Sequence, residues 1–187
     1  MRELYLECYS GISGDMTVAA LLDLGVPGEY LMKELEKLHL DGYEIKISKT
    51  KKNQITATDF DVILKDEHKE EHGHEHAHTH VNDEDVKECH EQEHSQEHTH
   101  VHNSYREIKE FILASELSDR VKEMILKIFQ VIAEAEAQVH GTAVDEVHFH
   151  EVGAVDSIVD ISAAAICLDY LGFDSIVTSE IWEGKGH

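Results

Sequence analysis

Hydrophobic and polar residues alternate in three stretches of the chain, and a short apolar run follows near its end, which together predict four strands. In the first stretch, Leu4, Leu6 and Cys8 share one face. The second and third stretches flank a polar turn around residues 51–53, which is typical of a hairpin. The predicted strands cover residues 2–8, 43–48, 55–64 and 175–178.

Apolar residues return every three or four positions in five other stretches, which predicts helices. Three of these stretches end at a glycine, Gly25, Gly141 or Gly172, which is a typical stop signal. The predicted helices cover residues 16–24, 29–38, 105–115, 118–140 and 155–171. In the fourth helix, the stripe expected to face the core consists of Val121, Ile125, Ile128, Ile132, Ala135 and Val139.

Strands near both ends, a hairpin between them and connecting helices predict an α+β fold. We expect a single domain made of residues 1–65 and 104–187, with a ferredoxin-like layer as one arrangement of its strands. Residues 66–103 are predicted to be a flexible, disordered insertion, which costs folding little because loop-closure entropy grows only logarithmically. Residues 182–187 have a loop-like sequence, so we expect this chain to be the front part of a longer protein, or a protein that works with a separately made second half.

The predicted insertion is rich in histidine and in acidic residues. Residues 66–102 hold eleven of the sixteen histidines, with twelve acids against two lysines, so their formal charge is −10. Imidazole nitrogens suit nickel, zinc, copper and iron, and carboxylates offset the charge of the cation. The predicted metal-binding histidines are His72, His74, His76, His78, His80, His98, His100 and His102. The alternative is a solvated acidic loop that binds any late divalent metal adventitiously.

Charge and cysteine content exclude several classes of protein. The formal net charge of −23 argues against nucleic acid and anionic membranes as partners. Three cysteines, Cys8, Cys89 and Cys167, lack Cys-x-x-Cys spacing, so no disulfide framework is predicted, and Cys8 and Cys167 are expected to be buried and inert. We find no signal-peptide pattern and no apolar stretch of membrane-spanning length, and we expect a soluble cytoplasmic protein.

The loop between the first strand and the first helix is a candidate binding site. Its members are Ser10, Gly11, Ser13, Gly14 and Asp15. Backbone amides in such a loop can point at an anion, and a helix N-terminus adds a favourable field. An acid at Asp15 would repel phosphate but can hold a metal. The alternative is that Ser13 or Asp15 only caps the helix.

The run His148-Phe149-His150-Glu151 is a candidate metal or proton-transfer site. In an extended segment, His148 and His150 point to the same face, roughly 6.5–7 Å apart. Two imidazoles with the Glu151 carboxylate beside them can grip a divalent cation or move protons. A lone histidine, by contrast, is more often a hydrogen-bonding residue without a chemical role.

Asp156 and Asp160 are four residues apart and therefore share one face of an otherwise apolar helix. Asp156 is either part of a site or merely an N-cap or first-turn acid that the helix dipole stabilises. Asp160 lies one turn further in, where an unpaired buried carboxylate is costly. Its expected partners are His148, His150 or a bound cation.

Two runs of this sequence resemble the LarC family. One is Cys-Tyr-Ser-Gly-Ile-Ser-Gly-Asp-Met at residues 8–16, and the other is Val-His-Phe-His-Glu-Val-Gly-Ala-Val-Asp-Ser-Ile-Val-Asp-Ile at residues 147–161. Their order, with a His-rich insertion between them, is that of the N-terminal portion of the family. These proteins insert nickel into the pincer nucleotide cofactor, a pyridinium bisthiocarboxylic acid mononucleotide, of lactate racemase-type enzymes.

The resemblance implies a CTP-dependent nickel chelatase of the lyase class. The CTP site, with Mg²⁺ or Mn²⁺, would belong to a C-terminal portion that this chain lacks, so we expect the chain alone to be inactive. The implied partners are Ni²⁺, the pincer nucleotide, the C-terminal portion and a lactate racemase-type apoenzyme, and homo-oligomers are a further expectation.

On this interpretation the insertion gathers Ni²⁺ and passes it to a site made of His148, His150, Glu151 and Asp15. Asp156 and Asp160 orient the imidazoles, as ligating histidines require, and the loop receives the phosphate or carboxylate of the substrate. Two other classes stay open. One is a nickel storage or delivery protein, and the other is a hydrolase or nucleotide-processing domain that uses the same residues around zinc or magnesium.

Overall fold

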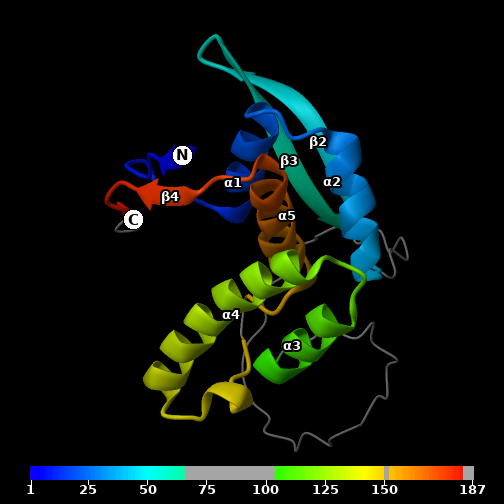
Figure 1. Cartoon of the computed structure of the whole chain (residues 1–187), viewed down its shortest axis with the longest axis vertical. Helices are drawn as coiled ribbons and strands as arrows, with labels where there is room; N and C mark the ends of the chain where they lie inside the picture. Colours follow the sequence, from blue (N-terminus) through cyan, green and yellow to red (C-terminus); the bar gives the residue numbers. More distant parts are fainter. Residues whose placement is uncertain (66–103, 150–151, 183–187) are drawn as a thin grey trace, which may run out of the picture.

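The computed structural model describes residues 1–65, 104–149 and 152–182. The elements in these ranges are, in chain order, β1 (Glu3–Leu6), α1 (Gly14–Asp23), α2 (Gly28–Leu35), η1 (Glu36–Leu38), β2 (Tyr43–Lys52), β3 (Ile55–Leu64), α3 (Tyr105–Ala114), α4 (Asp119–His140), η2 (Val144–Glu146), α5 (Val155–Leu171) and β4 (Ser175–Thr178). Helix α5 runs through the middle, with the β2–β3 hairpin towards one end of the molecule and α3 and α4 towards the other (Figure 1). The predicted α+β class is confirmed.

The first and last strands meet in one small parallel sheet. β1 pairs with β4 so that Leu4 lies opposite Ile176. The pairing continues past the strand ends, because the backbone N–H of Asp174 donates to Arg2 O at 2.8 Å and that of Ser179 donates to Leu6 O at 2.9 Å. Parallel strands need a long crossover connection, and here nearly the whole fold lies between the two strands.

Strands β2 and β3 form an antiparallel hairpin that is separate from the parallel pair. Its turn consists of Asn53 and Gln54, with φ of 50° and 68°, as a two-residue type I′ turn requires. The sequence placed the turn slightly early, because Lys51 and Lys52 look like turn residues although they belong to β2. The described strands thus lie in two separate pairs, and a ferredoxin-like layer stays a prediction.

The hydrophobic core is arranged around α5, which packs against α1, α2, α4 and β3. Ile158 and Ile166 of α5 and Phe129 of α4 are buried, and each side chain of this size stabilises the fold by about 1.5–3 kcal/mol. Burial raises the pKa of the Cys167 thiol to about 12, so this cysteine is unreactive at neutral pH, as predicted. In the described ranges, no helix is both long and apolar enough to cross a membrane.

The prediction for the buried face of α4 is partly wrong. Of the six predicted residues, Val121 and Ile125 are buried, Ile128 and Ile132 are half-buried, and Ala135 and Val139 are exposed. The buried row of α4 consists of Val121, Ile125, Phe129, Ala133 and Ala137. This row repeats every fourth residue, which is a common packing ridge of helices, and its alanines allow neighbouring elements to approach closely. The prediction followed the larger aliphatic side chains instead.

Candidate functional site

The loop of residues 10–15, here called the glycine loop, is in direct contact with helix α5. Gly14 is the first residue of α1, and Asp160 lies in the second turn of α5. A Cβ atom built on Gly14 would lie 2.5 Å from Asp160 Oδ2 and 2.7 Å from Asp160 Cβ. Side-chain carbons do not approach other atoms this closely, so the contact has room for glycine alone. Two motifs that are far apart in the sequence therefore share one surface.

Asp160 has the most perturbed carboxylate of this surface. Burial and the nearby carboxylates of Asp15 and Asp156 raise its pKa to about 6, and a hydrogen bond from the Asp15 backbone N–H partly offsets them. The Oδ1 atom of Asp160 is buried and has no hydrogen-bond partner among the described residues. A buried carboxylate oxygen without a partner is costly, so the environment favours a proton or a cation at this position.

The expected neighbours of Asp156 and Asp160 need correction. Asp156 is exposed in the first turn of α5 and its Oδ1 accepts a hydrogen bond from Ser157 N at 2.8 Å, whereas Ala154 is the N-cap. Asp156 is therefore a first-turn residue and not the N-cap, and its part in a site stays a prediction. Asp160 faces Gly14 and Asp15 rather than His148, a result of how α1 packs on α5 that residue spacing does not reveal. The other two expected partners, His150 and a bound cation, stay predictions.

The side chains at the start of α1 do not cap the helix. Ser13 stands at the N-cap position, but its Oγ donates to Asp15 Oδ1 at 2.5 Å instead of accepting from the first amides of α1. Ser13 and Asp15 are both exposed, as is Ser10. Gly11 has a φ of 84° and its N–H donates to Cys8 O at 3.1 Å, which closes a tight turn before the helix. The loop thus presents helix-terminal N–H groups and one carboxylate to solvent.

The segment that follows β4 holds this loop from the other side. The Trp182 N–H donates to Cys8 O at 3.4 Å, and the Cys8 N–H donates to Ser179 Oγ at 2.7 Å. The rings of Tyr9 and Trp182 meet edge to face with their centroids 6.0 Å apart. Sequence reasoning missed this pair, because its two members are brought together only by the parallel register of β1 and β4.

His148 is exposed and has a different neighbour. It forms an isolated antiparallel bridge with Ser104, and the Tyr105 N–H beside it donates to Val147 O at 3.0 Å. Phe149 is buried against the rings of Tyr105 and Phe129, so the segment alternates outward and inward as an extended segment should. Ser104 is the first described residue after the predicted insertion, so the described chain resumes beside His148.

Several predicted site residues lie outside the described residues. They are His150, Glu151 and the eight insertion histidines His72, His74, His76, His78, His80, His98, His100 and His102. Within the described part of the chain, no group of three or more His, Cys, Asp or Glu side chains is arranged to hold a metal ion. The metal site expected from His148, His150, Glu151 and Asp15 stays a prediction.

A second feature that sequence reasoning missed is the environment of Asp23, at the end of α1. Its carboxylate accepts from Lys49 Nζ at 2.5 Å and from the hydroxyl and backbone N–H of Thr58 at 2.6 and 2.9 Å. These hydrogen bonds lower the pKa of Asp23 to about 2. The network fixes α1 against the hairpin and so holds the loop at the other end of α1 in place. Thr58 is buried in β3, which gave no sequence signal for this role.

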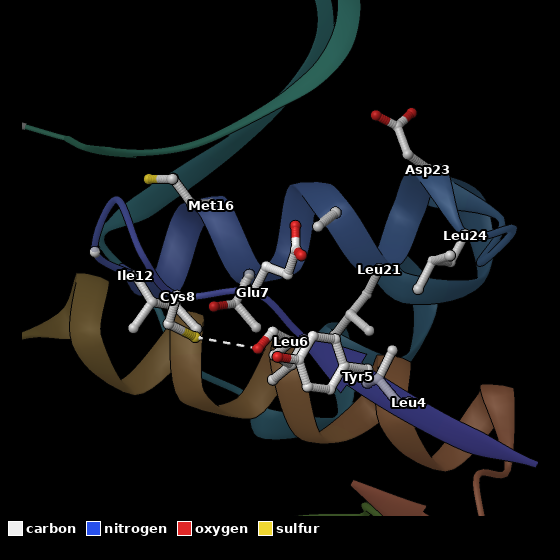
Figure 2. Close-up of a pocket in the computed structure, with 13 residues that line it drawn as sticks. Leu4, Tyr5, Leu6, Glu7, Cys8, Ile12, Met16, Leu21, Asp23 and Leu24 are labelled. Carbon is white, nitrogen blue, oxygen red and sulfur yellow. Dashed lines mark hydrogen bonds between the residues drawn. The ribbon is translucent and has the colours of Figure 1, made fainter. Parts of the chain in front are cut away.

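A hollow of about 440 Å³ opens beside the loop, between β1 and α1 (Figure 2). Its lining is largely apolar and includes Tyr5, Leu6, Ile12, Met16, Leu21 and Leu24. The hollow adjoins Gly11 at the turn before α1, so it borders the candidate site.

Comparison with known proteins identifies the family to which these motifs belong. The family model described as nickel insertion protein matches residues 4–187. The chain belongs to this family. The expected resemblance of the two motifs to nickel insertion proteins is thereby confirmed over nearly the whole chain.

Curated relatives carry names that agree with the family. The chain is 56% identical over 188 residues to the pyridinium-3,5-bisthiocarboxylic acid mononucleotide nickel insertion protein of Clostridium acetobutylicum, covering all of this chain and 45% of that protein. It is 51% identical over 192 residues to the protein of that name from Alkaliphilus metalliredigens, covering all of this chain and 41% of the relative. The chain thus spans about two fifths of the length of these relatives and corresponds to their N-terminal portion. No solved structure matches it.

Proposed function

We propose that this chain is the N-terminal portion of a CTP-dependent nickel insertase that loads Ni²⁺ into the pincer nucleotide of lactate racemase-type enzymes. The observation that carries the proposal is the contact of Gly14 with Asp160, which unites both motifs on one surface in a member of the nickel insertion family. Ni²⁺ is a substrate, and the acceptor is the mononucleotide that gives the relatives their name. CTP, with Mg²⁺ or Mn²⁺, binds the C-terminal portion, and this chain alone is inactive.

The first step in the proposal is the delivery of Ni²⁺ from the insertion to His148, His150 and Glu151. Imidazole is a good ligand for Ni²⁺, and a chain with eleven histidines between residues 66 and 102 offers many exchangeable sites. The bridge between Ser104 and His148 supports this route, because Ser104 directly follows the insertion in the sequence and lies beside the first of the receiving histidines.

The second step is the attraction of Ni²⁺ towards Asp15, Asp156 and Asp160. These carboxylates are not arranged to hold a metal ion by themselves, but they repel one another, as the raised pKa of Asp160 indicates. A divalent cation held beside them by the receiving histidines would reduce that repulsion. The unpartnered Oδ1 atom of Asp160 supports a role for this group as a ligand or as an acceptor that orients a ligating imidazole.

The third element of the proposal is the binding of the anionic groups of the substrate at Ser10, Gly11, Ser13 and Gly14. The Asp15 N–H donates to Asp160, but no side chain of the loop caps helix α1, so the other N–H groups of its first turn are available to a phosphate or a carboxylate. The adjacent carboxylates would repel an anion by themselves. A bound Ni²⁺ offsets that repulsion, so we expect metal and nucleotide to bind more tightly together than apart.

Nickel titration calorimetry at pH 7.5 tests this proposal. The intact chain is compared with a variant in which a short Gly/Ser linker replaces residues 66–103. We expect one tight site to survive the deletion and to weaken at least about tenfold in His148→Ala with His150→Ala, or in Asp160→Asn. The paired control is His39→Ala with His140→Ala, which removes two histidines from other elements. If the variant without the insertion bound no nickel at all, the proposal of a structured nickel site in the folded domain would be overturned.

A nickel storage or delivery protein is the second candidate function, and the composition of the insertion favours it. In that case the insertion is the whole function. Nickel insertion by the completed protein distinguishes the two. An insertase without residues 66–103 retains activity when Ni²⁺ is abundant, whereas a storage protein without them retains none.

A further inference from the structure

Strand β1 has one edge without a partner strand among the described residues. Along its other edge, Arg2 O and Leu6 O accept hydrogen bonds from the chain around β4. Backbone N–H and C=O groups of successive residues point to opposite edges of a strand. The groups of Glu3, Tyr5 and Glu7 therefore point to the free edge, where they could pair with a further strand.

The hollow between β1 and α1 lies along this free edge (Figure 2). Five consecutive residues, from Leu4 to Cys8, line it. Because successive side chains of a strand point to opposite faces, a hollow that touches all five borders the edge of the strand and not one of its faces.

The opposite wall of the hollow is the outer side of α1. Met16, Ala20 and Leu24 follow one another at one-turn spacing along that side, and Met16 and Leu24 are each 55% exposed. The inner side of α1 packs against α5 and β3. Helix α1 thus extends past the free edge of β1. The hollow beneath it lies where the next strand of the β1–β4 sheet would be. In this part of the molecule, apolar side chains and main-chain hydrogen-bonding groups lie exposed together.

We propose that the free edge of β1 receives a β-strand from the C-terminal portion of the family protein, with apolar side chains of that strand filling the hollow under α1. Main-chain bonds to Tyr5 and Glu7 would hold it, and alternate side chains would cover Met16 and Leu24. The relatives supply this occupant, since more than half of the length of each lies outside the region that this chain matches. The inference does not depend on the nickel chemistry proposed above.

Charge argues against a second copy of this chain as the occupant. Two copies of β1 paired antiparallel about Tyr5 would place Glu3 of one copy opposite Glu7 of the other, at both ends of the pair. Like charges directly opposite each other destabilise a strand pair. A partner strand with neutral or basic residues opposite Glu3 and Glu7 would avoid this repulsion.

Hydroxyl-radical footprinting read by mass spectrometry tests the inference, because tyrosine and methionine side chains are oxidised in proportion to their exposure. The chain alone is compared with the same chain continued, as one polypeptide, by the part of the Clostridium acetobutylicum relative that it does not match. We expect oxidation of Tyr5 and Met16 to fall at least about fivefold in the longer protein. Tyr170 is the matched control, since it is 45% exposed on α5 against 51% for Tyr5, and its rate should not change.

Other outcomes overturn the inference. Unchanged rates at Tyr5 and Met16, while buried Phe129 stays protected as a sign of correct folding, would show that nothing covers the edge. If the oxidation rates of Tyr5 and Met16 fell in the chain alone as its concentration rose, the edge would be occupied by a second copy of the chain. In the longer protein, Met16→Lys should restore oxidation of Tyr5 towards its rate in the chain alone. Val139→Lys, at an exposed position of α4, should leave that rate unchanged.

Discussion

Gly14 decides how closely α1 approaches α5, because the missing side chain makes room for the Asp160 carboxylate. Gly14→Ala would place a methyl group 2.5 Å from Asp160 Oδ2. We expect the variant to lose about 1–3 kcal/mol of unfolding free energy, since one of the two helices must shift. Urea denaturation measures the loss.

Gly28→Ala is the matched control for Gly14→Ala. Gly28 is likewise the first residue of its helix, α2, but a Cβ atom there meets only the flexible tip of Ile47 at 3.3 Å. We expect this variant to change the stability by less than about 0.5 kcal/mol, because alanine favours the helix and Ile47 can move. Equal losses in both variants would mean that the Gly14–Asp160 contact is not a close one.

Asp160→Asn should make the stability of the protein depend less on pH. Folding raises the pKa of Asp160 from an ordinary 3.8 to about 6, so the folded protein binds this proton more tightly than the unfolded chain does. The ionised carboxylate therefore lowers stability above about pH 6, and this loss disappears as the pH falls towards 4. We expect the variant to be more stable than the parent by about 1 kcal/mol at pH 7.5, after allowance for solvent screening.

Denaturation of both proteins at pH 4.5 and pH 7.5 checks this. The insertion is the same in parent and variant, so its contribution is removed by taking the difference. A difference that is the same at both pH values would contradict the assigned cause. Saturating Ni²⁺ at pH 7.5 should reverse the order, if the cation binds beside Asp160 as proposed, because only the parent retains the carboxylate.

At this scale the sequence identified residues but not their neighbours. Asp160 stood out as a carboxylate in an apolar helix, and its need for compensation follows from elementary electrostatics. Its contact with Gly14 depends on the packing of two helices separated by most of the chain, which no local pattern encodes. The partners of Asp23 were even less predictable from the sequence, since Lys49 and Thr58 come from two strands of the hairpin.

Among the elements, α3 has the most completely capped start. Ser104 Oγ accepts from the Glu107 N–H at 3.2 Å, while Glu107 Oε2 accepts from the Ser104 N–H at 3.1 Å, which is a capping box. Ser104→Ala should lower the melting temperature and cost about 1 kcal/mol. The comparison is Ser118→Ala at α4, where a single bond to the Val121 N–H at 3.3 Å is lost and a smaller decrease is expected. Equal decreases would contradict a special role for the box.

The ends of elements were predictable where the sequence contains a residue typical of a helix cap or a turn. Helix α4 ends where Gly141 takes a φ of 67°, and helix α5 ends at Gly172 with a φ of 61°, as the stop signals indicated. The buried side of α4 was less predictable. Small residues such as Ala133 and Ala137 can face the core as well as large ones, and only the neighbouring elements decide between them.

For the whole molecule, the insertion should contribute binding capacity and little stability. Replacing residues 66–103 by a short linker removes eleven histidines and leaves every described element intact. We expect the melting temperature without metal to change by only a few degrees, because loop-closure entropy varies slowly with length. The number of Ni²⁺ ions bound per chain should fall to about one. Differential scanning calorimetry and equilibrium dialysis measure these, and loss of cooperative unfolding would show that the insertion is part of the folded domain.

The class of the fold followed from the order of predicted elements, but the division of the strands into two pairs did not. The parallel pair joins residues 3–6 to residues 175–178, and such pairing depends on the path of everything between them. The free edge of β1 is equally invisible in sequence, because alternation marks the faces of a strand and not its edges.

The indole of Trp182 is the sole tryptophan side chain of the sequence, and it is 61% exposed against the ring of Tyr9. Selective excitation of this indole therefore gives a fluorescence signal from one place in the chain, the turn that leads into α1. A nucleotide that settles in the glycine loop, or a strand that docks on β1, would change the polarity around the same ring. The protein thus contains a natural optical reporter of its candidate site, and binding can be followed there without a label.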